Sequence, residues 1–149
     1  MQVSEIMSRA SVTDSASDTL KAAAERMWRQ QTGSLLVMDD GRLIGIITER
    51  DVMKAVARGA DLDATPVSAV MTTNVLTVSP STAVSAAAQH MSDRWIRHLP
   101  VVQDDAVIGM VSQRDLCGVL ARLAPEQTEP GDDGDLVRDR RLARVDPES

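Results

Sequence analysis

Residues 34–51 read SLLVMDDGRLIGIITERD, and the pattern returns at residues 98–115 as HLPVVQDDAVIGMVSQRD. Both stretches hold two short apolar runs on either side of a polar turn, and Asp-Gly at residues 40–41 is a strong hairpin signal. A helical pattern follows each second run directly. The predicted elements are strands 35–38 and 43–47 with a helix at 49–58, and strands 99–102 and 107–111 with a helix at 113–123.

The duplication extends well beyond these hairpins. Residues 3–58 lie over residues 67–122 without a gap, and roughly a third of the positions are identical. An ungapped register that also aligns Gly, Met, Arg and Asp is hard to obtain without duplication. A short strand is expected to open each copy, around residues 12–13 and 76–77.

An amphipathic helix is expected between the opening strand and the hairpin of each copy. Apolar residues recur there at i, i+3, i+4 and i+7, starting from Leu20 and from Val84. Ser17 and Ser81 stand just upstream as expected N-caps. Each copy therefore has the order β-α-β-β-α. Because one such unit buries little surface alone, we expect the two to share one core.

The domain boundaries follow from this alignment. We expect the first repeat at residues 3–60, a linker at 61–66 and the second repeat at 67–124, with both repeats in one module. The remaining residues, 125–149, are polar, acidic and rich in residues that break regular structure. That composition predicts a disordered tail.

Charge and aromatic content argue against nucleic acid as a partner. The net charge is -6, and residues 126–149 carry -4 of it, so the chain offers no basic patch. Phe and Tyr are absent, which argues against a base-stacking surface. Trp28 and Trp95 are the only large aromatic residues. We expect them to be buried in packing, with a cleft or dimer surface as the alternative.

Cys117 is the only cysteine, so the chain forms no internal disulfide and no cysteine metal cluster. We expect a buried structural thiol in a reducing cytoplasm. No apolar run approaches the roughly 20 residues that span a bilayer, and no signal peptide is evident. The sequence therefore predicts a cytoplasmic protein without a membrane partner.

The tandem pattern resembles a pair of cystathionine-β-synthase (CBS) motifs, known as a Bateman module. Its most specific strings are GIITERD at residues 45–51 and GMVSQRD at residues 109–115. The resemblance implies an α+β fold of two β-α-β-β-α repeats, related by a pseudo-two-fold axis and packed sheet to sheet. It also implies two clefts that hold AMP, ADP or ATP, or in some members S-adenosylmethionine or NAD. Many stand-alone pairs of this kind form homodimers.

Each string places a hydroxyl and a carboxylate where a strand meets a helix: Thr48 with Asp51, and Ser112 with Asp115. Exposed backbone N–H groups and the positive end of the helix dipole make such a junction an anion site. By resemblance, the hydroxyls contact phosphate or ribose, and the aspartates accept hydrogen bonds from the ribose hydroxyls. An ordinary capping box explains the same pattern without a ligand.

The two copies differ where a phosphate would be bound. Arg97 and His98 precede the second hairpin, whereas the first copy has Gly33 and Ser34. This basic pair resembles the one in regulatory kinase subunits, where residues at these positions bind phosphates. Arg97 offers a bidentate fork, and His98 adds charge only when it is protonated. We therefore expect two unequal sites.

Other residues of the strings are open to two explanations. Arg50 and Arg114 could reach phosphate or a dimer partner, and an exposed helix arginine explains them equally well. Gly45 and Gly109 lack a side chain beside the expected cleft, which would let a ligand approach closely. The two histidines are not clustered with carboxylates or cysteines, so we expect no metal.

Binding rather than catalysis fits this set of residues. No nucleophile can be paired with a base, and no P-loop is present, so we expect no enzyme activity and no covalent cofactor. The leading hypothesis is a regulatory sensor that binds an adenine nucleotide as ligand and signals to a client protein through module or dimer geometry. The rival is a ligand-free dimerisation or scaffold module, and a weaker alternative is an S-adenosylmethionine, NAD or nucleic-acid binder.

Overall fold

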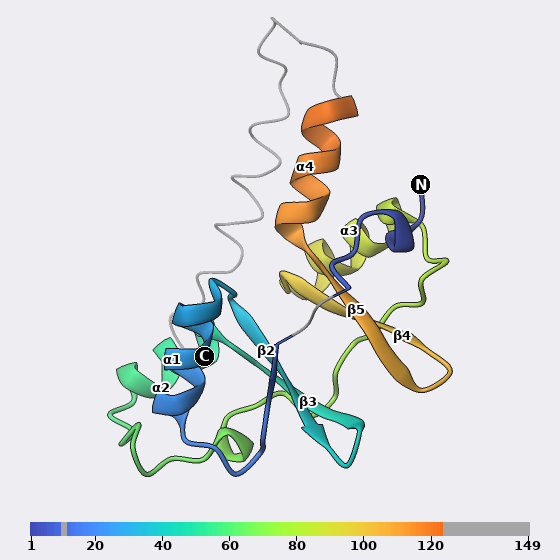
Figure 1. Ribbon diagram of the computed structural model, residues 1–149. Coiled ribbons are helices and arrows are strands. Elements are labelled where there is room, and N and C mark those ends of the chain that lie inside the picture. Colours follow the sequence, from blue (N-terminus) through green and yellow to red (C-terminus); the bar gives the residue numbers. More distant parts are fainter. Residues whose placement is uncertain (10–11, 124–149) are drawn as a thin grey trace, which may run out of the picture. The chain divides into compact units, whose positions relative to one another are not determined.

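The computed structural model describes residues 1–9 and 12–123, which contain both predicted hairpins (Figure 1). The predicted tail at 125–149 lies outside the described residues. The elements in chain order are η1 (Val3–Glu5), β1 (Thr13–Asp14), α1 (Leu20–Gln30), β2 (Ser34–Asp39), β3 (Arg42–Thr48), α2 (Glu49–Ala57), η2 (Val67–Ala69), α3 (Val84–Arg94), β4 (His98–Gln103), β5 (Ala106–Ser112) and α4 (Gln113–Leu123).

The two hairpins confirm the predicted strands, each of which extends one residue further at both ends than the apolar runs indicate. Strands β2 and β3 pair antiparallel, as do β4 and β5. Asp40 and Gly41 turn the first hairpin with positive φ angles of 46° and 75°. Asp104 and Asp105 make the same turn at 50° and 63° without a glycine. Aspartate tolerates this left-handed region better than most residues.

The opening strands of the two repeats differ in length, although the sequence predicts two of similar length. β1 lies one residue later than expected and pairs parallel with β2 through Thr13 and Asp14. In the second repeat the strand is reduced to a single parallel bridge between Val78 and Val101. That bridge repeats the pairing of Asp14 with Val37 in the first copy. The register of the two repeats is therefore the same, although only one has a third strand.

The predicted N-caps are wrong because both helices begin two residues later than a serine cap requires. Thr19 caps α1, and its Oγ1 accepts a hydrogen bond from the backbone N of Ala22 at 3.2 Å. Ala83 holds the cap position of α3 and supplies no side-chain bond. Ser17 and Ser81 instead lie in the preceding turns, each within 3.1 Å of another serine hydroxyl.

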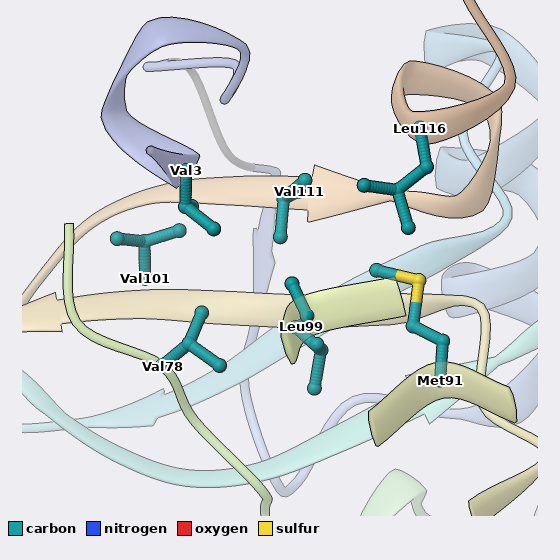
Figure 2. Packing of buried hydrophobic residues seen from close by; sticks show 8 residues of the cluster. Val3, Val78, Met91, Leu99, Val101, Val111 and Leu116 are labelled. Atoms are coloured by element: carbon teal, nitrogen blue, oxygen red, sulfur yellow. The ribbon is translucent and has the colours of Figure 1, made fainter. Parts of the chain in front are cut away.

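The apolar residues form two clusters rather than the single shared core that the sequence suggests. Each hairpin packs against its own helices, and a valine from the other repeat completes each cluster. Figure 2 shows Val3, from the start of the chain, beside Val101 and Val111 of the second repeat. The buried members of one cluster are Leu20, Ala23, Met27, Leu35, Val37, Ile47, Ala55 and Val67. Those of the other are Val3, Val78, Ala87, Met91, Leu99, Val101, Val111 and Leu116.

The repeats exchange their opening segments, which we define as residues 3–8 and 67–72. The backbone N of Val3 donates to the carbonyl of Thr82 at 2.9 Å, and Val67 donates in the same way to Asp18 at 2.8 Å. These four residues occupy equivalent positions of the alignment. Such a reciprocal exchange is what a two-fold relation between the repeats produces.

Gly45 and Gly109 are required by this exchange rather than by a ligand. A Cβ on Gly109 would lie 2.6 Å from the carbonyl oxygen of Ser8, and one on Gly45 would lie 2.6 Å from Sδ of Met71. The space that the missing side chains leave is therefore filled by the opening segments. The expectation that these glycines admit a ligand is wrong for this reason.

Both faces of each hairpin are buried. Leu35 and Val37 point toward the helices, yet Leu36, between them, is also fully buried, as is its counterpart Pro100. Strands β3 and β5 lie against one another, so the sheets meet on the faces that the helices do not cover. This arrangement is the predicted packing of sheet on sheet, within one compact unit, Met1–Val119.

Three apolar residues are more exposed than predicted. Trp28 is 79% exposed and Trp95 40%, and Cys117 is also exposed. Trp28 lies in the last turn of α1, and Trp95 ends α3 in a left-handed conformation with φ 54°. None of the helices in the described ranges is long and apolar enough to cross a bilayer.

Candidate functional site

A cleft of about 1070 Å³ lies between the end of α1 and the start of α4 and receives residues from both repeats. Its polar lining comes from both repeats and includes the junction of β5 with α4. The apolar lining comes from the first repeat and from Met110. The lining residues are Ser8, Val12, Ala24, Met27, Trp28, Gln30, Gln31, Thr32, Gly33, Ser34, Glu49, Val52, Arg97, His98, Met110, Ser112, Gln113, Arg114, Asp115 and Cys117.

At the cleft, Ser112 and Asp115 form the capping box that the sequence offered as the alternative explanation. Oδ2 of Asp115 accepts from both the backbone N and the Oγ of Ser112, at 2.7 Å each. In return the backbone N of Asp115 donates to Oγ of Ser112 at 3.3 Å. The cap occupies only Oδ2, and Oδ1 makes no hydrogen bond to any described residue. One carboxylate oxygen therefore remains as an acceptor.

Thr48 and Asp51 form the same box at the start of α2, with bonds of 2.8 and 3.0 Å to Oδ2 of Asp51. These two residues, and Arg50 between them, are not among those that line the cleft. Arg50 instead reaches across to the carbonyl oxygen of Trp95 at 3.5 Å. Of the eight predicted binding residues, the cleft brings five together: Arg97, His98, Ser112, Arg114 and Asp115.

The charged groups of the cleft balance one another. Its lining holds two guanidinium groups and two carboxylates, from Arg97, Arg114, Glu49 and Asp115. Nη2 of Arg97 lies 2.6 Å from Oε1 of Glu49 in an ion pair that joins the two repeats. Arg114 forms no hydrogen bond or ion pair with a described residue. One of the two guanidinium groups of the cleft is therefore outside any ion pair with a described residue.

His98 is partly buried at the start of β4. Burial, with the charge of Arg97 as the next cause, lowers the pKa of its imidazole below the ordinary value of 6.5. The ring is therefore neutral at pH 7, so it can donate or accept a hydrogen bond but adds no positive charge. The expected basic pair thus has one charged member, Arg97.

The sequence did not single out several lining residues. Glu49 follows Thr48 and Val52 follows Asp51, both in α2. In the alignment of the two repeats, Glu49 is opposite Gln113. That difference between the copies was the available signal. Met27 and Met110 carry no such signal, since a methionine at an apolar position is usually core. Within the described ranges, no three His, Cys, Asp or Glu side chains gather as a metal site.

The sheet register, the exchanged segments and the two capping boxes are features of one duplicated fold. A family model for the CBS domain matches residues 3–58 and, again, residues 67–122. The chain belongs to the CBS domain family. This assignment confirms the predicted pair of CBS motifs, and the solved structures that the CBS pair resembles confirm its α+β fold.

Three similar proteins place the CBS pair among its relatives. The mitochondrial CBS domain-containing protein CBSX3 of Arabidopsis thaliana is 41% identical over 105 residues, which cover 66% of this chain and 51% of the relative. The chain thus spans about half the length of that protein. The CBS domain pair of MJ0100, solved with 5′-methylthioadenosine and S-adenosyl-L-methionine, is 28% identical with a TM-score of 0.77, and the match covers 83% of this chain and 98% of that one. The protein PAE2072 from Pyrobaculum aerophilum, solved with AMP, is 28% identical with a TM-score of 0.75 over the same shares.

Proposed function

We propose that this CBS pair is a regulatory module, without catalytic activity of its own, that binds an adenine nucleotide in the cleft described above. The observation that carries the proposal is the grouping of Arg97, Arg114, Ser112 and Asp115 around one cleft with an apolar wall. Two similar CBS pairs bind adenosyl ligands, namely AMP in one and S-adenosyl-L-methionine with 5′-methylthioadenosine in the other.

The cleft supplies each group that a nucleotide needs. Val12, Met27 and Met110 offer an apolar surface for the adenine ring. Oδ1 of Asp115 is a free acceptor for the ribose hydroxyls. The phosphate would meet Arg114 and the first turn of α4, where backbone N–H groups and the helix dipole favour an anion.

A ligand in this cleft contacts both repeats and one exchanged segment. Ser8, at the end of the first opening segment, lines the cleft and is bonded to Met110 of β5 through two backbone bonds of 2.9 Å. A ligand changes the balance between two arrangements only if it binds them unequally. The contacts to both repeats provide such a difference, and a client protein would respond to the favoured arrangement.

Thermal unfolding of the full chain tests the proposal with AMP, ADP, ATP, NAD and S-adenosylmethionine. A ligand at about 100 times its Kd adds about 2.7 kcal/mol to the free energy of unfolding. For a chain of this size that corresponds to a rise in Tm of about 5–10 °C. Asp115→Ala is expected to abolish this rise, because it removes the ribose acceptor from the cleft.

Asp51→Ala is the matched control, since it removes an equivalent cap that does not line the cleft. Both variants should lose a similar capping contribution of about 1 kcal/mol in the absence of ligand. Only Asp51→Ala should keep the ligand-induced rise in Tm. If no compound in the panel raises Tm of the unmodified chain, the nucleotide proposal fails.

A second copy of the chain is the partner that we propose for the exposed face of α2. Met53 is 65% exposed and Val56 55%, and their i, i+3 spacing places them on one side of the helix. This face also favours the rival function, a scaffold that dimerises without ligand. We further propose a cytoplasmic module without nucleic-acid or membrane partners, on the basis of its acidic balance and single cysteine.

Val56→Glu is expected to convert the proposed dimer to a monomer, because a charge in a small apolar interface remains unpaired. Sedimentation velocity of the full chain measures the change. Ser85→Glu introduces the same charge on the exposed side of α3 and should leave the assembly unchanged. A monomeric unmodified chain at micromolar concentration would contradict the homodimer.

A further inference from the structure

Glu49 is the one charged residue of the cleft that the proposed function does not use. Its Oε1 lies 2.6 Å from Nη2 of Arg97, and both side chains line the cleft. Glu49 begins α2 of the first repeat and Arg97 precedes β4 of the second, so the ion pair crosses between repeats. The equivalent positions hold Gln113 and Gly33, which cannot form an ion pair. Of the two equivalent places in the duplicated fold, only the one with Glu49 and Arg97 can therefore hold this ion pair.

The backbone fixes Glu49 against the floor of the cleft. Its N donates to the carbonyl of Gly33 at 3.0 Å, just as the N of Gln113 donates to Arg97 at 2.8 Å. A Cβ on Gly33 would meet Cδ of Glu49 at 3.4 Å and Cε1 of His98 at 3.3 Å. The absence of a side chain at Gly33 thus leaves room for the carboxylate of Glu49 beside His98 and within reach of Arg97.

The state of the two arginines in the cleft determines how many phosphates a ligand can place there. Of the two arginines that line the cleft, Arg114 is unpaired and Arg97 is neutralised by Glu49. A monophosphate can be met by Arg114 and the first turn of α4. Further phosphates need a second cation, and their charge is unfavourable beside a fixed carboxylate.

We propose that Glu49, by holding Arg97, limits the number of phosphates that the cleft accepts and so makes it selective for a nucleoside monophosphate. This inference rests on the proposed function. Glu49 is a positioning residue that acts through Arg97, and its side chain is 58% exposed, so its replacement leaves the fold intact. Selectivity for phosphate number is the property that it sets.

Isothermal titration calorimetry of the full chain with AMP, ADP and ATP tests the inference. The unmodified chain should bind AMP at least as tightly as ATP. Glu49→Gln should tighten ATP binding about tenfold, the effect of one charge-assisted bond, and change AMP binding less than about twofold. Glu25→Gln, which removes an exposed carboxylate of α1 outside the cleft, controls for net charge and should change neither ligand.

Arg97→Gln shows whether Glu49 acts through the arginine. In that background, Glu49→Gln should no longer tighten ATP binding. An unchanged ratio of ATP to AMP affinity in Glu49→Gln, or an equal gain without Arg97, would overturn the inference while the nucleotide proposal stands. If neither the unmodified chain nor Glu49→Gln binds any of the three nucleotides, the proposed function fails, and the inference fails with it.

Discussion

Gly109→Ala is expected to lower the free energy of unfolding by about 3 kcal/mol, near the upper end of the usual cost of overpacking. The added Cβ would lie 2.6 Å from the backbone oxygen of Ser8 and 3.0 Å from Sδ of Met7. Two backbone bonds of 2.9 Å tie Ser8 to Met110, so the segment cannot retreat without breaking them. Urea unfolding followed by far-ultraviolet circular dichroism measures the loss.

Gly45→Ala is the matched variant in the other repeat, and its expected cost is only about 1 kcal/mol. The nearest atom to its Cβ is Sδ of Met71 at 2.6 Å, which is the end of a flexible side chain. The nearest backbone atom, the oxygen of Thr72, lies farther away at 3.1 Å. Equal losses in the two variants would contradict the explanation by backbone contact.

A second large effect is expected from pH, because Asp14 alone should make the fold about 2 kcal/mol less stable at pH 7 than at pH 4.5. Asp14 is buried at the end of β1, bonded to Arg26, and its Oδ2 has no partner among the described residues. Burial, followed by the neighbouring carboxyl of Asp18, raises the pKa of Asp14 from 3.8 to about 6.

The sign follows from which state holds the proton more tightly. Because the folded pKa lies above the unfolded one, the folded state binds the proton better, and the protonated acid stabilises the fold at low pH. That contribution declines from about pH 4 and is lost as the pH rises through about 6. Asp18 has a lowered pKa, chiefly through its bond to Asp14, so its own contribution changes below the ordinary value of 3.8.

Asp14→Asn cannot titrate and should lose the decline in stability between pH 4.5 and pH 7. Asp63→Asn removes an exposed carboxylate, 3.2 Å from Lys21, and should keep the wild-type decline. Urea unfolding of the three proteins at both pH values provides the comparison. A decline of wild-type size in Asp14→Asn would show that Asp14 is not its source.

The regular elements were predictable because local patterns determine them. Short apolar runs on either side of a polar turn specify the hairpins, and pairing adds one residue to each strand end. The helices with apolar periodicity were found for the same reason. The opening strands were placed only approximately, because a run of two residues carries little pattern: β1 lies one residue later than predicted, and its counterpart is a bridge at Val78 that depends on its partner.

The sequence predicted part of the candidate site, and the residues it missed or misjudged depend on the tertiary structure. Ser112 and Asp115 were proposed from the motif string and Arg97 from a difference between the copies, and all three line the cleft. Glu49 was missed because its partner comes from the other repeat, which spacing along one repeat does not reveal. The predicted burial of Trp28 and Cys117 was wrong because residue type alone does not tell which way a helical side chain faces, and both line the cleft.

The exchanged opening segments have a consequence for how such a chain arises. A polypeptide with one repeat would leave its hairpin without the valine that completes the cluster, and it could obtain that residue only from a second molecule. Two such molecules would trade segments reciprocally, which is a domain-swapped dimer. The present chain has the form of that dimer after fusion of its genes. A chain cut within residues 61–66, the proposed linker, should yield halves that are stable only when they reassociate.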